Sequence, residues 1–259
     1  MDLGLAGCSA VVTGGSKGIG LAIVRGLAAA GAQVTVGARK SSADLDELAR
    51  TGQVQVVLTD LADPAGPASL ITKAGNQIDV LVNNVGGAPA RTGGFLSITD
   101  EDWRATIELD LMAAVRATRA ALPAMLAAGT GVIVTICSVN ARLPDPAVMD
   151  YSVAKAGLAS FCKALSKEVG PRGIRVNTVS PGPVSTELWL GDHGVAATVG
   201  GSQGVDRNAV VREQEQQAST GRFTTPDEVA DLVLLLASER AGNTTGSDFV
   251  IDGGLVSTL

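Results

Sequence analysis

Short apolar runs alternate along the chain with segments of helical periodicity. The apolar runs are Ala10–Thr13, Gln33–Val36, Gln53–Leu58, Val80–Val82, Val132–Ile136, Val176–Val179 and Phe249–Ile251. The helical segments between them include Asp44–Arg50, Glu101–Ala128, Tyr151–Gly170 and Pro226–Ser238. This alternation predicts an α/β fold, in which right-handed crossovers give a doubly wound parallel sheet with helices on both faces. No repeat, linker or composition break appears, so we predict a single domain over residues 1–259.

A glycine-rich turn, Thr13–Gly20, separates the first predicted strand from the helical stretch that begins at Leu21. The free N–H groups and the dipole at a helix N-terminus favour negative charge, and glycines let phosphates approach the backbone closely. The glycine spacing differs from that of the usual dinucleotide fingerprint, so a plain tight turn is the alternative from this motif alone. The residues expected to contact a nucleotide are Gly14, Ser16, Lys17, Gly18, Ile19 and Gly20.

Composition and charge narrow the function classes. Apolar residues make up 46% of the 259 residues and charged residues 18%, which is enough apolar material for a sizeable core. The net charge of −6, without a basic block, argues against nucleic acid as a partner. The N-terminal residues lack the features of a signal peptide, and no apolar run approaches the length of a membrane span. We therefore expect a cytoplasmic protein with no membrane partner.

The cysteines point to no special chemistry. Cys8, Cys137 and Cys162 are odd in number and far apart in the chain, so neither a disulfide framework nor a metal site follows from them. We expect small buried side chains in a reducing compartment, and no metal ligands.

The end of the second predicted strand bears on the choice of cofactor. NAD-binding proteins of this type place an acidic residue about 20 residues past the glycines, on the ribose 2′-hydroxyl. This chain has Ala38, Arg39 and Lys40 there, and Lys17 adds a second positive charge nearby. Arginine can hold a 2′-phosphate through charge-assisted hydrogen bonds, so we predict NADP(H) in preference to NAD(H). The alternative is that Arg39 and Lys40 only form a solvated helix entry.

Two further strand ends carry polar residues or glycines. Asp60, followed by Leu61, could accept a hydrogen bond from an adenine amino group, or it could form an ordinary turn before Pro64. The stretch Asn83–Gly87 has two amides and two glycines, which can satisfy exposed backbone and let a cofactor approach. A turn without a ligand is the alternative for this stretch as well.

A tyrosine and a lysine follow the fifth predicted strand, which ends at Ser138. Tyr151 and Lys155 are four residues apart, so they share one face of a helix. An ammonium beside a phenol favours the phenolate and lowers the tyrosine pKa, which makes tyrosine a usable proton donor and acceptor. Ser138 could hydrogen-bond the same substrate oxygen. The Tyr-x-x-x-Lys pattern is usually structural, but Tyr151 is the single tyrosine of the chain and opens a helix after a strand-end serine.

Taken together, these motifs resemble those of the short-chain dehydrogenase/reductase family. The motifs are Thr13-Gly14-x-x-x-Gly18-x-Gly20, Asn83-Asn84-Val85-Gly86, Ser138, Tyr151-x-x-x-Lys155 and Asn177-x-x-x-Pro181-Gly182. They occur in the family's order and spacing and cover nearly the whole chain. The resemblance implies a Rossmann-type fold and an oligomer, either a dimer or a tetramer, built on the helices at Glu101–Ala128 and Tyr151–Gly170.

The resemblance also implies roles for individual residues. Tyr151 would be the general acid/base, Ser138 would orient the substrate's carbonyl or alcohol, and Lys155 would hold the nicotinamide ribose. Cofactor contacts would also come from Asp60, Leu61, Asn83, Gly86, Pro181, Gly182 and Val184. Asn83 in particular would support the cofactor loop.

One position departs from the family pattern. The family usually has an asparagine seven residues after the position of Trp103, where this chain has Asp110. The family's geometry would place this side chain behind Lys155, linked to it through backbone or water. An ionised carboxylate there would keep the Tyr151 pKa higher than an asparagine would. The alternative is that Asp110 only caps or hydrates the helix interior.

A long segment without strand signal, at about residues 184–225, is expected to form a substrate lid. A helix is predicted within it over Asp206–Ala218. Leu188 and Trp189 are candidate substrate contacts, with packing of the lid on its own domain as the alternative. His193, the single histidine, is expected to be a solvated loop residue.

The leading prediction is an NADP(H)-dependent oxidoreductase acting on a carbonyl or alcohol. The alternative is a catalytically silent NADP(H)-binding protein that regulates or scaffolds. By pattern the chain is most similar to the 3-oxoacyl carrier-protein reductases, which tend to carry basic residues before the fifth strand to meet an acidic carrier. Here that link, Ala127–Gly131, has no charge, which favours a free small-molecule substrate.

Overall fold

The computed structural model describes residues 2–257, which contain a seven-stranded sheet with the strand order β3-β2-β1-β4-β5-β6-β7. Every neighbouring pair of strands is parallel. The strands are β1 (Ser9–Thr13), β2 (Gln33–Ala38), β3 (Val54–Leu58), β4 (Val80–Asn83), β5 (Gly131–Ile136), β6 (Ile174–Pro181) and β7 (Asp248–Ile251). The order reverses between β1 and β4, which is where open α/β sheets bind their ligands. The predicted α/β sheet is therefore confirmed.

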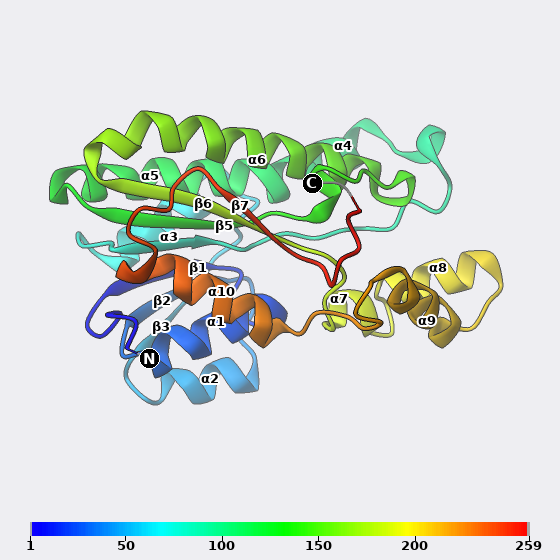
Figure 1. Cartoon of the computed structure of the whole chain (residues 1–259), viewed down its shortest axis with the longest axis horizontal. Helices are drawn as coiled ribbons and strands as arrows, with labels where there is room; N and C mark the ends of the chain where they lie inside the picture. Colours follow the sequence, from blue (N-terminus) through cyan, green and yellow to red (C-terminus); the bar gives the residue numbers. More distant parts are fainter. Residues whose placement is uncertain (1, 258–259) are drawn as a thin grey trace.

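Helices cover both faces of this sheet (Figure 1). One face carries α1 (Gly18–Ala29), α2 (Ala43–Ala49) and α10 (Pro226–Ala237), and the other carries α3 (Gly66–Ala74), α5 (Ala113–Ala128) and α6 (Met149–Val169). Adjacent residues of a strand point to opposite faces, so Val12 packs in the core on one side and Val11 in the core on the other. The predicted strands lie within two residues of the observed bounds.

The predicted helix over Glu101–Ala128 is interrupted. Helix α4 (Asp100–Ile107) passes into a π-helical segment, Glu108–Met112, before α5 begins at Ala113. A π-helical turn holds one more residue than an α-helical turn, and such turns are frequent at functional sites. Apolar periodicity does not reveal a single extra residue, and for this reason the sequence pattern predicted one continuous helix.

The same stretch, Asp100–Ala128, is also long and apolar. By length and composition alone, Asp100–Ala128 could cross a membrane, so one helix of the described chain reaches the length that the sequence analysis excluded. Only 33% of its most apolar window is buried. The buried side chains, which include Ala117, Ala121 and Met125, pack in the core on the sheet.

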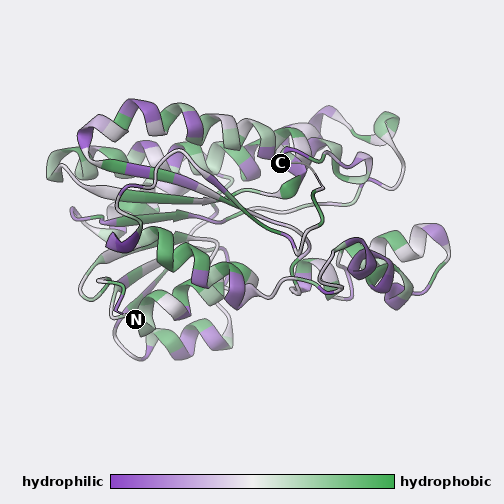
Figure 2. Ribbon diagram, in the orientation of Figure 1, coloured by the Kyte–Doolittle hydropathy of each residue, from purple (hydrophilic) through white to green (hydrophobic). Residues whose placement is uncertain are grey.

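The predicted lid segment contains α7 (Glu187–Leu190), α8 (Val195–Gln203) and α9 (Arg207–Gln217). An isolated parallel bridge between Val184 and Thr224 joins its two ends. Figure 1 shows these helices beside the sheet rather than over either face. Helix α9 buries none of its residues, and in Figure 2 it is largely hydrophilic. The predicted helix at Asp206–Ala218 is therefore confirmed, and it borders the site rather than the core.

Candidate active site

The glycine turn after β1 has the backbone geometry of a phosphate-binding turn. Gly14 and Gly18 have φ values of 72° and 54°, which a residue with a side chain rarely adopts. A Cβ at Gly20 would overlap the carbonyl oxygen of Gly14. Lys17, the N-cap of α1, makes no side-chain cap, and the first turn of α1 contains no acidic residue. The first N–H groups of α1 therefore lack a side-chain acceptor, as a phosphate-binding turn requires.

Asn84, rather than Asn83, supports this turn. Its Nδ2 donates to the carbonyl oxygens of Thr13 at 3.0 Å and Gly14 at 2.8 Å. Asn83 is only 3% exposed, and its Nδ2 donates to the hydroxyls of Thr118 at 3.0 Å and Thr135 at 3.4 Å. Asn83 is not among the residues that line the cleft, so its side chain lies behind the cleft wall and its part in cofactor binding stays a prediction. Neighbouring residues at a strand end point to opposite sides, and the sequence pattern did not distinguish the two amides.

A cleft of about 1820 Å³ lies beyond the carboxyl ends of the strands. The other predicted site residues all line it: Gly14, Ser16, Lys17, Gly18, Ile19, Gly20, Arg39, Lys40, Asp60, Leu61, Gly86, Asp110, Ser138, Tyr151, Lys155, Pro181, Gly182, Val184, Leu188 and Trp189. The fold thus brings residues from distant parts of the chain to one cavity.

The nucleotide end of this cleft carries exposed positive charge. Arg39 and Lys40 follow β2 directly and are exposed, and neither forms an ion pair with any residue in the described range 2–257. Lys17 lies 3.5 Å from Glu187 of α7, with both side chains exposed. Asp60 accepts a hydrogen bond from the N–H of Ala62 at 3.0 Å, so it forms a strand-end turn while it also lines the cleft. Its contact with adenine stays a prediction.

Lys155 and Asp110 form a buried ion pair beside Tyr151. Lys155 Nζ lies 3.6 Å from Asp110 Oδ1, and it donates to the carbonyl oxygen of Ile136 at 3.2 Å. The side chains are 4% and 1% exposed. Lys155 Nζ is 5.5 Å from the centroid of the Tyr151 ring. The expected link through backbone or water is therefore a direct contact between the two charged groups.

The loop after β4 also contacts the Asp110 carboxylate of this ion pair. The N–H of Gly87 donates to Asp110 Oδ1 at 3.1 Å. A Cβ at Gly86 would lie 2.5 Å from the same oxygen, so a side chain there would displace the carboxylate. Burial raises the Asp110 pKa to about 6, although Lys155 and the Gly87 N–H both favour the charged form. Asp110 therefore carries its charge above about pH 6.

Burial also decides the state of Tyr151. The cost of burying a phenolate raises the Tyr151 pKa above its usual value, and this outweighs the opposing effect of Lys155. The Asp110 carboxylate raises it further. The expectation of a lowered pKa is thus wrong in this structure, because it considered the lysine and not the burial. A raised pKa keeps the phenol protonated at neutral pH.

Ser138 is held by a residue that the sequence analysis did not single out. Its hydroxyl donates to Asn140 Oδ1 at 3.1 Å and accepts from the Asn140 N–H at 3.1 Å.

The predicted lid segment adds further polar groups, since His193, Glu213, Gln214 and Gln217 also line the cleft. His193 is exposed, as expected, but at the cleft. Trp189 both lines the cleft and packs edge-on against Phe223, with ring centroids 5.4 Å apart.

We expect Asp110→Asn to lower the pKa of Tyr151. The carboxylate is ionised above about pH 6 and raises the Tyr151 pKa, so removal of its charge leaves the positive field of Lys155 less opposed. Cys137 and Ser138 also face the phenol and are unchanged in this variant. The pH profile of alcohol oxidation at saturating cofactor gives one measurement, in which the basic limb should move to lower pH.

Titration of the tyrosinate absorbance gives a second measurement, independent of activity, because Tyr151 is the single tyrosine. An unchanged midpoint, or an upward shift, would leave Asp110 with a structural role only.

Comparisons with known proteins agree with this geometry. A family model described as "Enoyl-(Acyl carrier protein) reductase" matches residues 14–256. The chain is 34% identical to L-xylulose reductase of Mus musculus, over 100% of both chains. It is also 34% identical to the 3-oxoacyl-[acyl-carrier-protein] reductase FabG of Escherichia coli (strain K12), over 95% of this chain and 96% of the other.

Among solved structures, L-sorbose reductase from Gluconobacter frateurii, complexed with NADPH and L-sorbose, is similar over 100% of both chains. Its TM-score is 0.90 and its sequence identity is 36%. The matched family model spans nearly the whole chain, and the L-xylulose reductase, at 34% identity, matches it over 100% of both chains. The chain therefore belongs to the short-chain dehydrogenase/reductase family of oxidoreductases.

Proposed function

We propose that this protein is an NADP(H)-dependent oxidoreductase that interconverts a carbonyl compound and its alcohol. The observation that carries the proposal is the group formed by Ser138, Tyr151 and Lys155, which lines the same cleft as the glycine turn. Because these three side chains could transfer a proton beside a phosphate-binding turn, the cleft favours an enzyme over a catalytically silent binding protein.

The residues of this group have distinct roles in reduction. When bound, the nicotinamide supplies the hydride for reduction or accepts it in oxidation. The Tyr151 hydroxyl donates a proton to the carbonyl oxygen, and Ser138 hydrogen-bonds the same oxygen. The Lys155 ammonium stabilises the phenolate that results. Because burial keeps Tyr151 protonated at neutral pH, the resting enzyme holds the proton that reduction requires.

NADP(H) is the cofactor that the residues around the cleft fit. The first N–H groups of α1 would meet the pyrophosphate, and Arg39 with Lys40 would meet the 2′-phosphate. β2 ends without the acidic residue that would repel this phosphate. The NADPH complex of the similar L-sorbose reductase supports the same choice.

An uncharged, free carbonyl compound is the substrate that the charges of the cleft favour. Among residues 2–257, the lysines and arginines that line it are Lys17, Arg39, Lys40 and Lys155. Lys155 is paired with Asp110, and the other three lie at the nucleotide end. The lid side is lined instead by Glu187, Asp192 and Glu213. A phosphate, carboxylate or acidic carrier on the substrate would meet no spare cation there. The names of the L-xylulose and L-sorbose reductases, both referring to uncharged ketoses, support this class.

A panel of carbonyl compounds tests the proposal. NADPH oxidation is followed with L-xylulose and L-sorbose, and with a ketose phosphate, a keto acid and an acetoacetyl thioester as charged comparators. A phosphate taken out of water without a cationic partner costs about 1–3 kcal/mol or more, which a neutral ketose avoids, so kcat/KM for a neutral ketose should exceed that of its phosphate by roughly 10-fold or more. A preference for the anionic compounds would contradict the substrate class. Tight NADPH binding with no turnover of any carbonyl would favour the silent binding protein.

We also infer an assembly of two or four copies. Within one chain, only 33% of the most apolar 18-residue stretch of Asp100–Ala128 is buried. On α6, Val153 is 50% exposed. Apolar helix faces of this kind are stabilised when a second copy covers them. The molar mass in solution, measured by light scattering, should be two or four times the 26.1 kDa of one chain, and any other value would contradict the inference.

A further inference from the structure

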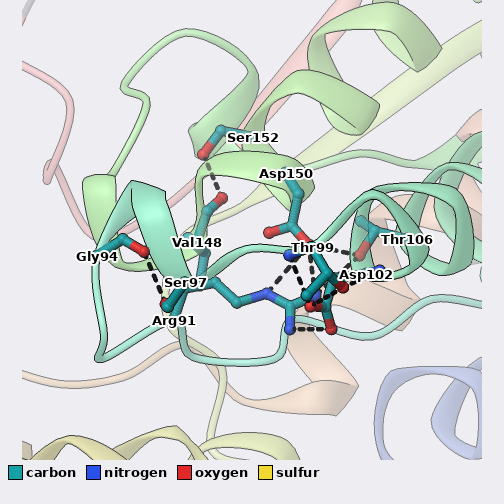
Figure 3. Close-up of polar contacts among 9 residues, drawn as sticks. All are labelled: Arg91, Gly94, Ser97, Thr99, Asp102, Thr106, Val148, Asp150 and Ser152. Carbon is teal, nitrogen blue, oxygen red and sulfur yellow. Dashed lines mark hydrogen bonds and ion pairs between the residues drawn. The ribbon is translucent and has the colours of Figure 1, made fainter.

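Arg91 joins three segments around the active site. Its Nε and Nη2 donate to Asp150 Oδ2 at 3.1 and 2.6 Å, and its Nη1 donates to Asp102 Oδ1 at 2.8 Å (Figure 3). Thr106 Oγ1 donates to Asp150 Oδ2 at 2.7 Å. We call Arg91, Asp102, Thr106 and Asp150 the Arg91 cluster. It connects the loop after β4, helix α4 and the first turn of α6.

The Arg91 cluster lies largely out of water. The Asp150 side chain is 0% exposed and that of Arg91 is 16% exposed. Burial opposes the charge of Asp150, but the hydrogen bonds from Arg91 and Thr106 outweigh it and hold the Asp150 pKa below its usual value. Arg91 therefore neutralises a carboxylate that could not stay ionised without a partner. The pair is a fixed internal contact, unlike the exposed ion pairs elsewhere on the surface.

The position of the cluster relates it to Tyr151. Asp150 directly precedes Tyr151, in the first turn of α6. The N-cap of α6, Val148, makes no side-chain hydrogen bond, and Asp145 caps only the short 3-10 turn Pro146–Val148 that precedes the helix. Arg91 adds contacts to both parts, because its backbone N–H also donates to the Ala147 carbonyl oxygen at 2.6 Å. The residue that would transfer the proton thus sits next to the residue that Arg91 holds.

Asp102 connects the Arg91 cluster to the helical element that carries Asp110. Asp102 receives Arg91 and also closes the capping box at the start of α4, with Thr99. Helix α4 runs directly into the π-helical segment that carries Asp110. The loop that carries Arg91 also supplies the Gly87 N–H that holds Asp110. One arginine therefore ties together the two elements whose side chains meet beside Tyr151.

We propose that Arg91 is a positioning residue that fixes Tyr151, Lys155 and Asp110 relative to one another. This inference rests on the proposed function. Arg91 is not among the residues that line the cleft, so it acts through Asp150 and Asp102 and not on the substrate. Small displacements of a proton donor lower turnover strongly, while binding of a cofactor held by other elements is affected little. The structure accordingly predicts a selective loss in kcat when the cluster is broken.

Arg91→Met and Arg91→Lys test this inference, with Arg104→Met as the matched control. Arg104 lies on α4 and forms an exposed pair with Asp100, at 3.6 Å. We expect Arg91→Met to lower kcat by about 10-fold or more, with the NADPH dissociation constant within about threefold of the unaltered protein. Arg91→Lys keeps the charge but loses the planar fork, so its kcat should fall by about threefold or more, though by less than that of Arg91→Met. Arg104→Met should match the unaltered protein.

Several results would overturn the inference. An Arg91→Met or Arg91→Lys protein with a lower melting temperature but kcat within twofold of the unaltered protein would make Arg91 merely structural. Parallel losses in kcat and NADPH affinity would indicate a general disturbance of the cleft. If Arg91→Met fails to fold, Arg91→Lys alone decides by the same two readings.

If the unaltered protein turns over no carbonyl compound, the proposed function fails separately. The tyrosinate titration of Tyr151, the single tyrosine, then decides on Arg91. The groups that face the phenol are Lys155, Asp110, Cys137 and Ser138, none of which changes in these variants. Loss of the Arg91 charge should raise the midpoint, and a midpoint equal to that of Arg104→Met would overturn the inference.

Discussion

Tyr151→Phe is expected to lower turnover by about 100-fold or more, while the affinity for NADPH stays within a few-fold. The substitution keeps the ring that lies 5.5 Å from Lys155 Nζ and removes only the hydroxyl. Without it, the proposed proton donor is lost, while Ser138 and Lys155 are unchanged. The loss should appear in kcat, because proton transfer belongs to the reaction and not to cofactor binding. Steady-state kinetics and NADPH fluorescence titration measure the two quantities.

Ser138→Ala is the companion variant for this measurement. It removes a hydrogen bond to the substrate oxygen but leaves the proton donor, so its loss in kcat should be smaller than that of Tyr151→Phe. A Tyr151→Phe protein that kept most of its rate would show that another group supplies the proton, and the assigned mechanism would be wrong.

Arg39→Ala is expected to weaken NADPH binding by roughly 10- to 100-fold and NADH binding by no more than a few-fold. One lost charge-assisted contact to the 2′-phosphate is worth about 1.5–3 kcal/mol, and NADH has no phosphate there. Arg39 has no ion-pair partner within the described chain, so the substitution leaves no acidic side chain unpaired. Isothermal titration with each nucleotide gives both affinities.

Arg50→Ala is the matched control for Arg39→Ala. Arg50 is an exposed arginine at the end of α2, away from the cleft, and its loss changes the net charge equally. It should affect both nucleotides alike and weakly. Equal affinity of the unaltered protein for NADPH and NADH would contradict the assignment of Arg39 and Lys40 to the 2′-phosphate.

The sheet and the cleft could be predicted because their determinants are local. Each buried strand is a short apolar run, and parallel strands bring their carboxyl ends to one edge of the sheet. Arg39, Asp60, Gly86 and Ser138 all follow strands, so their presence in one cleft follows from the alternation of strands and helices. The two adjacent amides, Asn83 and Asn84, show the limit of this reasoning. Periodicity locates the end of a strand, but which of two adjacent amides faces the cleft depends on side-chain packing.

The state of Tyr151 required three-dimensional information. The four-residue spacing to Lys155 predicts proximity correctly, since both lie on α6 and face the cleft. The pKa direction, however, depends on how much water reaches the phenol and on Asp110, which comes from another helix through a π-helical segment. Burial and long-range contacts of this kind have no signature in a short motif.

The Arg91 cluster lay beyond prediction for a similar reason. Asp102 lies 11 positions after Arg91 in the sequence and Asp150 lies 59 positions after it, and each alone is an ordinary charged residue. Only the packing of the β4 loop between α4 and α6 brings them together. Likewise, the lid was predicted as a segment, but the side of α9 that meets the cleft follows from its three-dimensional arrangement.

Transfer of deuterium from NADPH deuterated at the nicotinamide C4 tests the central claim most directly. The label is offered with the best neutral ketose from the panel, and the product is analysed by mass spectrometry and NMR. The account predicts one deuterium on the carbinol carbon of the alcohol, transferred from one face of the nicotinamide, and loss of this product with Tyr151→Phe. Deuterium placed instead on a carbon of a reduced double bond in an enoyl substrate, with no label in any carbinol, would contradict it.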